Sequence, residues 1–448
     1  MNDTIVAIST TTGVGAISII RLSGPESIEI LSKVFTKDLS NIETHTIHYG
    51  HIKDKEEIID EVLVSIMRAP KTFTREDIIE INCHGGVAPT NKVLEVILKN
   101  GARLAEPGEF TKRAFLNGRI DLLEAEATMD LISSATDKAR KISINTLTGE
   151  TSNLIKDLRS NLVGIISNIE VNIDYPEYED IEVLTNDKIL PNITKFKEKL
   201  EYIIKKSEDS KIVKEGINVG IIGKPNVGKS SLLNSLLEEE KAIVTDIPGT
   251  TRDIVEGKIV LDGIMLNVID TAGIRQTDDV VEKIGVERSI KTIDSSDLVI
   301  FILNNNEIIS EEEKELLQKL EDKKKIIVVN KIDLENKLDK RILENFIEIS
   351  VKEELGIDKV KEEIKKLFNL GEIEANDMTY LSNARSISLL HKTMNSINEA
   401  IKEIELASPI DIVELNLKDA WNTLGEVIGE TYTDELIDEL FSRFCLGK

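Results

Sequence analysis

The chain is poor in several residue types that mark particular classes of protein. Only two of its 448 residues are cysteines, Cys83 and Cys445, too few for a disulfide framework, which favours a reducing compartment. No cysteines and histidines have the spacing of a zinc site, and no run of eighteen apolar residues could cross a membrane. The first residues lack the basic stretch and apolar core of a signal peptide. We therefore expect a soluble cytoplasmic protein with no membrane partner.

Basic residues are scarce relative to acidic ones. The chain has 81 Asp and Glu residues against 56 Lys and Arg residues, which gives a formal net charge of −25. Binding to nucleic-acid phosphates needs Lys and Arg close together, and like charge elsewhere on the protein weakens it. Basic residues gather only locally, as at Lys112–Arg113 and residues 138–141. Composition alone therefore argues against a strongly basic nucleic-acid-binding surface.

Three short motifs follow one another in the middle of the chain. Gly223–Ser230 fits G-x-x-x-x-G-K-[ST], Asp270–Gly273 is D-T-A-G, and Asn330–Asp333 is N-K-I-D. The first motif follows the apolar run Ile217–Ile222, which predicts a buried strand, and a helix is expected to begin near Lys229. Together the motifs predict a P-loop domain that binds and hydrolyses GTP with Mg²⁺.

The phosphate side of this site has a chemical reason for each residue type. Glycines allow a tight turn whose N–H groups point at phosphate oxygens, beside the positive end of a helix. Lys229 should reach the β- and γ-phosphates, and Ser230 and Thr251 should hold Mg²⁺. For Thr251 a polar turn is the alternative. The residues expected at the phosphates are Asn226, Val227, Gly228, Lys229, Ser230, Ser231, Thr245, Asp246, Ile247, Pro248, Gly249, Thr250, Thr251, Asp270, Thr271, Ala272 and Gly273.

Guanine selection is predicted at the third motif. The Asp333 carboxylate can accept hydrogen bonds from N1–H and the exocyclic amine of guanine. Adenine offers no such pair of donors and would leave the charge unpaired, at a cost of roughly 1–3 kcal/mol. A second loop, Ser350–Lys352, follows another apolar run and resembles the last guanine-contacting loop of GTPases. The residues expected at the base are Asn330, Lys331, Asp333, Ser350, Val351 and Lys352.

The group that positions the attacking water is not obvious from the residues alone. Ile274 stands where signalling GTPases carry a glutamine, and an isoleucine cannot orient water. Either hydrolysis is very slow or another group acts. The nearby charged residues Arg252, Arg275, Glu282 and Arg288 are alternatives, although charges in the amphipathic stretch 278–288 could also form a solvated helix face.

Length and periodicity predict three domains. Residues 1–118 mix short β-branched runs with a helical stretch, which predicts a compact α/β domain. Residues 119–215 and 372–448 have apolar residues at helical spacing. The economical interpretation is one helical domain split by an inserted Ras-like P-loop G domain at residues 216–371. The predicted fold is therefore multidomain α/β plus α.

Segments along the whole chain resemble one family of bacterial GTPases. Gly223–Asn234 and Pro248–Asp253 are shared by a group that includes ribosome-assembly factors. Several other segments look like the tRNA-modification GTPase MnmE (TrmE) family, and the terminal tetrapeptide is particularly specific. These segments are Asp3–Thr10, Gly15–Gly24, Cys83–Gly86, Glu106–Asn117 and Cys445–Lys448.

This resemblance implies a potassium-dependent G domain that is activated when two copies meet. Asn226 would be a potassium ligand, with carbonyl groups near Thr245, Ile247 and Thr250 completing the cage. The ion would supply positive charge beside the phosphates, where other GTPases use an arginine. Glu282 matches the family glutamate that positions the attacking water through an intervening water, so the resemblance makes Glu282 the catalytic residue.

The resemblance also implies a folate site in the first domain, which would dimerise. It would hold a tetrahydrofolate with a one-carbon unit, in the 5-formyl or 5,10-methylene form. Matching positions are Arg21, Glu80, Arg119 and the terminal Lys448, although many relatives have lysine at the position of Arg119. A carboxylate suits the donor edge of a pterin, and basic groups suit the glutamate tail. Cys445 is a candidate reactive thiol, with an idle cysteine as the alternative.

The family works as a homodimer with the flavoprotein MnmG on C5 of the wobble uridine, position 34, of certain tRNAs. The implied cofactors are GTP, Mg²⁺, K⁺ and tetrahydrofolate, with FAD only through the partner. Because this chain is acidic, the partner would supply much of the tRNA contact. One rival is a ribosome-assembly GTPase switch, which predicts a basic RNA-binding domain that is not visible here. Another is a stand-alone folate enzyme with a regulatory G domain.

Overall fold

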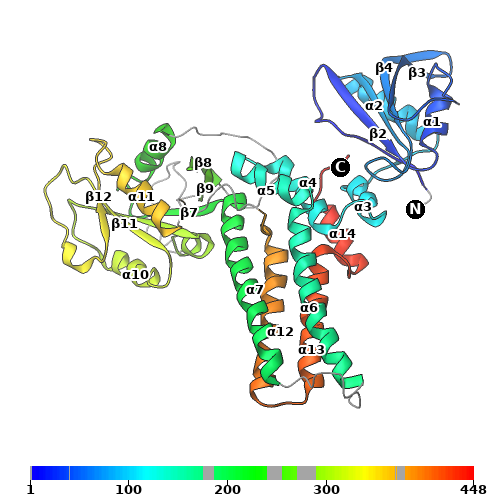
Figure 1. The fold of residues 1–448 in the computed structure, drawn as a ribbon. Helices are drawn as coiled ribbons and strands as arrows, with labels where there is room; N and C mark the ends of the chain where they lie inside the picture. The colour runs from blue at the N-terminus through cyan, green and yellow to red at the C-terminus, as the bar shows by residue number, and fades with distance from the viewer. Residues whose placement is uncertain are drawn as a thin grey trace. The chain divides into compact units, whose positions relative to one another are not determined.

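The chain divides into two compact units in a computed structural model, which describes residues 3–39, 41–174, 186–239, 255–269, 289–368, 370 and 379–447. The first unit comprises residues 1–129, 147–183 and 409–448, and the second comprises residues 130–146 and 184–408. Each unit contains a six-stranded sheet and a pair of long helices (Figure 1). This combination confirms the predicted mixture of α/β and helical parts. The three domain boundaries predicted from the sequence stay a prediction.

The first unit begins with a mainly antiparallel sheet in the order β3-β4-β5-β2-β1-β6. Only the short pairing of β1 with β6 is parallel. The run Ile5–Ile8, expected to be a strand, forms β1, and this sheet confirms the α/β character predicted for the region. Its other strands are β2 (Ile17–Ser23), β3 (Thr46–Asp54), β4 (Glu57–Met67), β5 (Ile78–His84) and β6 (Arg103–Leu104).

Two helices cover one face of this sheet. Along each strand alternate residues point to opposite faces, so every second apolar residue lies in the core. Ile20 and Leu22 of β2 and Val64 of β4 are fully buried in this way. They pack with residues of α1 (Ser27–Val34) and α2 (Val87–Lys99).

The opposite face of the same sheet is only partly covered. Near β1 it is closed by Phe110 of α3 (Glu109–Leu116). Further along, Ile47, Tyr49 and Leu63 of β3 and β4 are 67%, 59% and 48% exposed. One face of this sheet therefore carries apolar side chains that reach solvent.

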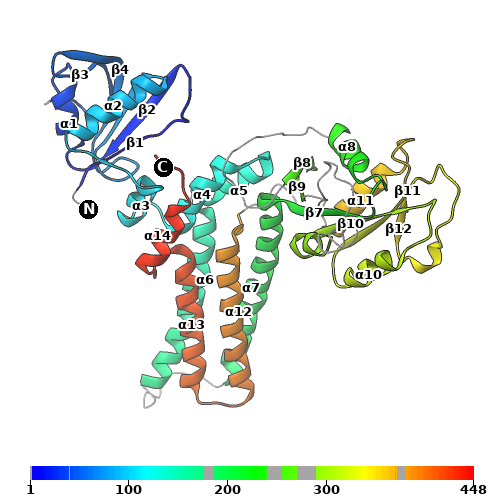
Figure 2. The ribbon, with the colours of Figure 1, turned by 180° about the vertical axis from the view of Figure 1, so that it is seen from behind.

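The C-terminal segment returns to the N-terminal part of the first unit. Phe441 of α14 (Asp434–Ser442) and Phe444 after it pack against Phe115 of α3 in an apolar cluster. Before α14, α13 (Ile410–Ile428) lies along α6 (Glu150–Asp174), and both views show this pair (Figures 1 and 2). The helices α4 (Leu122–Ser133) and α5 (Asp137–Leu147) precede α6 and confirm the predicted helical periodicity.

The sheet of the second unit is mainly parallel, in the order β12-β11-β10-β7-β9-β8. Only β8 runs antiparallel to its neighbour β9. The predicted strand at Ile217–Ile222 is confirmed with the same bounds as β7. The other strands are β8 (Val255–Leu261), β9 (Ile264–Ile269), β10 (Leu298–Asn304), β11 (Lys325–Asn330) and β12 (Phe346–Glu348).

Both faces of this parallel sheet are buried. Ile300 and Ile302 of β10 pack in one apolar cluster, whereas Val299 and Phe301 pack in another on the opposite face. A strand buried on both faces reads as a continuous apolar run, as β10 does. The covering helices are α8 (Lys229–Glu239) and α11 (Ile357–Leu367) on one face and α10 (Glu311–Lys319) on the other. The same unit contains the helix pair α7 (Asn186–Glu215) and α12 (Ala384–Glu405).

Candidate functional site

The predicted phosphate-binding loop connects β7 to α8, and α8 begins at Lys229 as expected. Gly228 has φ +105°, and a Cβ there would lie 2.3 Å from the Asn330 side-chain nitrogen, so only glycine fits. The Lys229 ammonium donates to the carbonyls of Gly223 and Lys224 at 2.7 and 2.8 Å. Burial lowers the pKa of this ammonium. A partly buried cation at a helix N-terminus suits phosphate.

A buried carboxylate ties this loop to a neighbouring helix. The Lys224 ammonium lies 2.9 Å from Glu313, whose side chain is 6% exposed. Glu313 also accepts the backbone N–H and hydroxyl of Ser310, in the capping box of α10. The loop is thus fixed from outside as well as by its own glycines. Sequence reasoning did not identify Lys224 or Glu313.

The Asn330 side chain joins three of the predicted segments. It is 3% exposed. Its amide nitrogen donates to the Val227 carbonyl of the phosphate loop at 2.7 Å. Its amide oxygen accepts the Val351 N–H of the last predicted guanine loop at 3.2 Å. The phosphate loop and the last predicted guanine loop, which are about one hundred and twenty residues apart in the chain, therefore meet at one edge of the sheet.

The Asp333 carboxylate lies beside the same loop. It accepts the Ser350 hydroxyl at 2.7 Å. This hydrogen bond lowers the pKa of Asp333, and the charges of Lys352 and Lys331 act in the same direction. The group is therefore a carboxylate at neutral pH, as acceptance from guanine N1–H and N2 requires. The structure thus brings together Asn330, Asp333 and Ser350, as expected.

The Arg21–Glu80 pair forms a second polar site in the first unit. Both residues are cross-strand partners on β2 and β5. The Arg21 Nη2 and Nε atoms lie 2.8 and 2.9 Å from Oε1 of Glu80, and both side chains are about a fifth to a quarter exposed, at 21% and 25%. Because both contacts use Oε1, the other carboxylate oxygen can receive a further donor.

The C-terminal tail reaches this pair. The Gly447 carbonyl accepts hydrogen bonds from Arg21 Nη1 at 3.3 Å and from the Ser9 hydroxyl at 3.2 Å. Gly447 has φ +85°, and a Cβ there would lie 2.5 Å from the Ile8 carbonyl oxygen. Cys445 has an exposed free thiol, and its backbone carbonyl accepts a hydrogen bond from the Gly108 N–H. Ser9 was not predicted as a site residue, since a lone serine directly after a strand carries no signal.

Arg119 lies against the same apolar cluster but contacts other groups. Its guanidinium lies over the Phe73 ring at 5.1 Å, whereas that of Arg21 lies over Phe110 at 5.7 Å. Phe73 and Phe110 pack together. The two arginines therefore flank one pair of rings, and the described contacts of Arg119 do not include Glu80.

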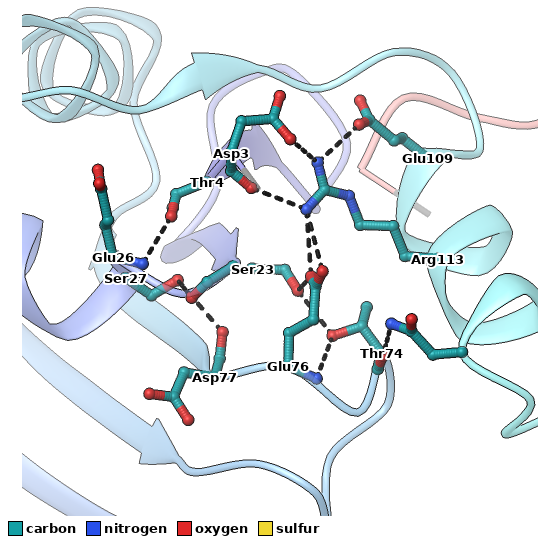
Figure 3. Close-up of polar contacts among 12 residues, drawn as sticks. Asp3, Thr4, Ser23, Glu26, Ser27, Thr74, Glu76, Asp77, Glu109 and Arg113 are labelled. Carbon is teal, nitrogen blue, oxygen red and sulfur yellow. Dashed lines mark hydrogen bonds and ion pairs between the residues drawn. The ribbon is translucent and has the colours of Figure 1, made fainter. Parts of the chain in front are cut away.

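A buried ion-pair network holds α3 next to these residues. The Arg113 guanidinium bonds to Asp3 at 2.8 Å, to Glu109 at 3.0 Å and to Glu76 at 3.2 Å (Figure 3). Arg113 is fully buried, and Arg103 adds a second cation on Asp3 and Glu109. The spacing of Glu109 and Arg113, four residues apart on one helix, was a signal that sequence reasoning left unused.

Several predicted site residues lie outside the residues that the structure describes. They come from residues 245–251, the D-T-A-G motif, the glutamate that is expected to position water, and the chain terminus. They are Thr245, Asp246, Ile247, Pro248, Gly249, Thr250, Thr251, Asp270, Thr271, Ala272, Gly273, Glu282 and Lys448.

Within the described ranges, no three His, Cys, Asp or Glu side chains gather in a way that could hold a metal ion. Over the same residues, no helix has the length and apolar character needed to cross a membrane.

Comparison with known proteins gave matches over nearly the whole chain. A family model described as the MnmE helical domain matches residues 122–445, and one described as the GTP-binding protein TrmE N-terminus matches residues 4–119. The tRNA modification GTPase MnmE of Bacillus licheniformis is 52% identical over 458 residues, with 100% of both chains covered. That of Bacillus subtilis is 51% identical over 458 residues, also with 100% of both covered. Among solved structures, Era with MgGDPNP and 16S ribosomal RNA nucleotides is 29% identical over 34% of this chain and 56% of that chain, with a TM-score of 0.26.

Proposed function

We propose that potassium-dependent GTP hydrolysis drives a conformational cycle of this chain, which belongs to the tRNA modification GTPase MnmE family. Membership of this family makes the chain a GTP hydrolase that acts in tRNA modification. The cycle serves modification at C5 of the wobble uridine, position 34, in certain tRNAs. The chain acts as a homodimer with an MnmG-type flavoprotein, which brings FAD. A tetrahydrofolate bound by the first domain supplies the added carbon.

The contacts of Asn330 carry the nucleotide part of this proposal. Its amide connects the phosphate loop to the last guanine loop, with Asp333 next to it. Lys229 and the backbone N–H groups of the loop bind the β- and γ-phosphates, and the Ser230 hydroxyl is a ligand for Mg²⁺. Thr251 is the second hydroxyl ligand. When bound by these hydroxyl groups, Mg²⁺ would supply positive charge beside the phosphate oxygens on which negative charge develops.

Asn226 is the described residue of the proposed potassium cage. It is exposed at the tip of the phosphate loop, with the unusual φ of +61°. An amide oxygen there is a suitable ligand for a hard monovalent cation. Carbonyls near Thr245, Ile247 and Thr250 would complete the cage when two G domains meet, and Glu282 would position the attacking water.

GTP turnover by the full chain in potassium and in sodium, at equal ionic strength, tests this mechanism. We expect faster hydrolysis in potassium, and loss of that advantage in Asn226→Lys because the ligand is removed. The control is the same change at Asn234, which is exposed on α8. Equal rates of the unmodified chain in both salts would overturn the cage.

The Arg21–Glu80 pair and the tail support the folate site. The second oxygen of Glu80 can accept from the donor edge of a pterin, while Arg21, Arg119 and Lys448 suit the glutamate tail. Equilibrium binding of 5-formyl-tetrahydrofolate should weaken about tenfold or more in Glu80→Gln, because a charge-assisted hydrogen bond is lost. Glu57→Gln, on the exposed end of β4, is the control. Unchanged affinity in Glu80→Gln would contradict the site.

The exposed apolar residues on the outer sheet face support the homodimer. Tyr49 and Leu63 are cross-strand partners, and Ile47 lies two residues before Tyr49 on the same face. A second copy would remove these side chains from water. Light scattering of Leu63→Glu should show monomers, whereas Leu406→Glu, at another exposed leucine, should leave the dimer intact. A dimeric Leu63→Glu variant would exclude this face.

We also propose that the Cys445 thiol, which the C-terminal tail carries, takes part in tRNA modification. It is exposed and lies two residues before the Gly447 carbonyl that Arg21 holds. Cys445→Ser should reduce tRNA modification with GTP turnover unchanged. Full modification by this variant would remove the thiol from the mechanism.

A further inference from the structure

Asn305, directly after β10, is a buried residue whose contacts span the guanine loop, which we define as residues 330–338. It is 2% exposed. Its backbone N–H donates to the Asn330 carbonyl at 2.9 Å, at the start of the loop. Its backbone carbonyl accepts the N–H groups of Lys337 and Leu338 at 2.9 and 3.2 Å, at the end of the loop. Both ends of the guanine loop are therefore fastened to one residue.

The Asn305 side chain holds the middle of the same loop. Its amide nitrogen donates to the Leu334 carbonyl at 3.1 Å. Leu334 follows Asp333 directly, so this bond fixes the Leu334–Glu335 peptide, the second peptide after the residue whose carboxylate would accept from guanine. The Asp333 side chain is fixed from the other side by the Ser350 hydroxyl. Ser350 thus holds the Asp333 carboxylate, and Asn305 holds the residue that follows it.

The remaining polar atom of Asn305 shows that the residue is not placed for packing alone. Its amide oxygen is buried and makes no hydrogen bond among the described residues. Burying a polar atom without a partner is unfavourable, and an apolar side chain of similar size would avoid the cost. The bond to the Leu334 carbonyl is the compensating interaction that the side chain provides.

We propose that Asn305 is a positioning residue for guanine specificity, which acts by holding the Leu334 peptide so that Asp333 faces the exocyclic amine of the base. This inference rests on the proposed guanine site. The recognised chemistry is the N2 amine of a guanine nucleotide, which inosine nucleotides lack. Asn305 touches the loop and not the base, so its effect should appear in selectivity.

The test measures the dissociation constants of fluorescent GDP and IDP for the full chain. In Asn305→Ala we expect the affinity for GDP to fall about tenfold and that for IDP by no more than about twofold, because IDP keeps N1–H but lacks the N2 amine whose hydrogen bond needs this alignment. Asn305→Asp, which keeps the shape but loses the donor to Leu334, should give the same loss of selectivity. In an Asp333→Ala background the Asn305 substitution should no longer change the ratio.

The neighbouring Asn306 provides the matched control. Its amide oxygen is also buried without a partner, but its N–H donates to Asn304 and not to the guanine loop. Asn306→Ala should leave the GDP to IDP ratio unchanged. Equal losses for both nucleotides in the two Asn305 variants, or no loss at all, would overturn the inference. Failure of the unmodified chain to prefer GDP would instead overturn the guanine site itself, and this inference with it.

Discussion

The mainly antiparallel sheet of the first unit carries its polar groups in the middle of its strands, whereas the mainly parallel sheet of the second unit carries them in loops after its strands. Arg21 and Glu80 face each other across β2 and β5. Lys229 and Asp333 instead follow β7 and β11. Parallel sheets are covered on both faces, so their strand ends are the places where a ligand can approach. An antiparallel sheet can leave one face open, and there a site can lie on the face itself.

The two regions also differ in how far apart in sequence the interacting residues are. The phosphate loop occupies one continuous stretch, Gly223–Ser230, so its glycines and lysine form a recognisable motif. The Arg21 site combines residues from both ends of the chain, since the Gly447 carbonyl lies 426 positions from Arg21. Short-range sites leave motifs in a sequence, and sites built from distant strands do not.

Removing one carboxylate from the buried network should have the largest effect on stability. Burial raises the pKa of Glu109, but hydrogen bonds from Arg103, the Glu106 N–H and Arg113 outweigh it and hold this pKa below its ordinary value. Glu109→Gln should lower the free energy of unfolding at neutral pH by about 3–5 kcal/mol, because it leaves buried Arg113 short of a partner. Denaturant titration measures this effect.

The effect of Glu109→Gln on the free energy of unfolding should depend on pH. A carboxyl group with a lowered pKa in the folded chain contributes stability above its unfolded pKa and loses it as the pH falls through the folded pKa. The difference between Glu109→Gln and the unmodified chain should therefore shrink below about pH 4.3. Glu29→Gln, at an exposed pair with Lys33, is the control and should change little. A pH-independent difference would contradict the account.

In the second unit, a substitution in the phosphate loop should lower GTP turnover. Lys229→Ala should lower GTP turnover by about a hundredfold or more, because the ammonium beside the phosphates is lost. Lys314→Ala, on the surface of α10, should leave turnover unchanged. Circular dichroism should show both variants folded. A folded Lys229→Ala variant with normal turnover would remove the phosphate loop from the mechanism.

The contact between the C-terminal tail and Arg21 should be broken by a single added methyl group at Gly447. Gly447→Ala places a Cβ against the Ile8 carbonyl in a backbone conformation that side chains disfavour. We expect binding of 5-formyl-tetrahydrofolate to weaken about tenfold, since the tail no longer meets Arg21. Gly164→Ala, in the middle of α6 where nothing lies within 4 Å, is the matched control. Equal affinities for the two variants would separate the tail from the folate site.

The smallest expected effect is a titration shift on the open sheet face. The Asp60 carboxylate, 2.6 Å from Nδ1 of His84, raises the pKa of this histidine. The contribution of the protonated His84 to the free energy of unfolding should be complete below about pH 6.5, and it should be lost as the pH rises through the raised pKa of His84 in the folded chain. Nuclear magnetic resonance should show a lower pKa for His84 in Asp60→Asn. An unchanged pKa would show that the pair does not form in solution.

Sequence reasoning predicted the second unit more completely than the first. The strand at Ile217–Ile222 and the helix from Lys229 were placed correctly, because apolar periodicity and glycine spacing are local properties. Arg21 and Glu80 were identified through the family resemblance, and their direct pairing was not anticipated. Ser9 and Asn305 were missed, since each is an ordinary residue until its distant partners are known, whereas Arg113 was missed although its spacing from Glu109 was a local signal.

What the sequence determined by itself is the chemistry of the nucleotide and the class of the fold. Those depend on residue types at fixed short intervals, which set backbone turns and strand or helix periodicity. The tertiary structure decided which distant polar groups meet. It joined Asn330 to Val227 and Val351, and Gly447 to Arg21. A hydrogen bond forms only between atoms about 3 Å apart, and which residues reach that distance depends on how whole sheets and helices pack.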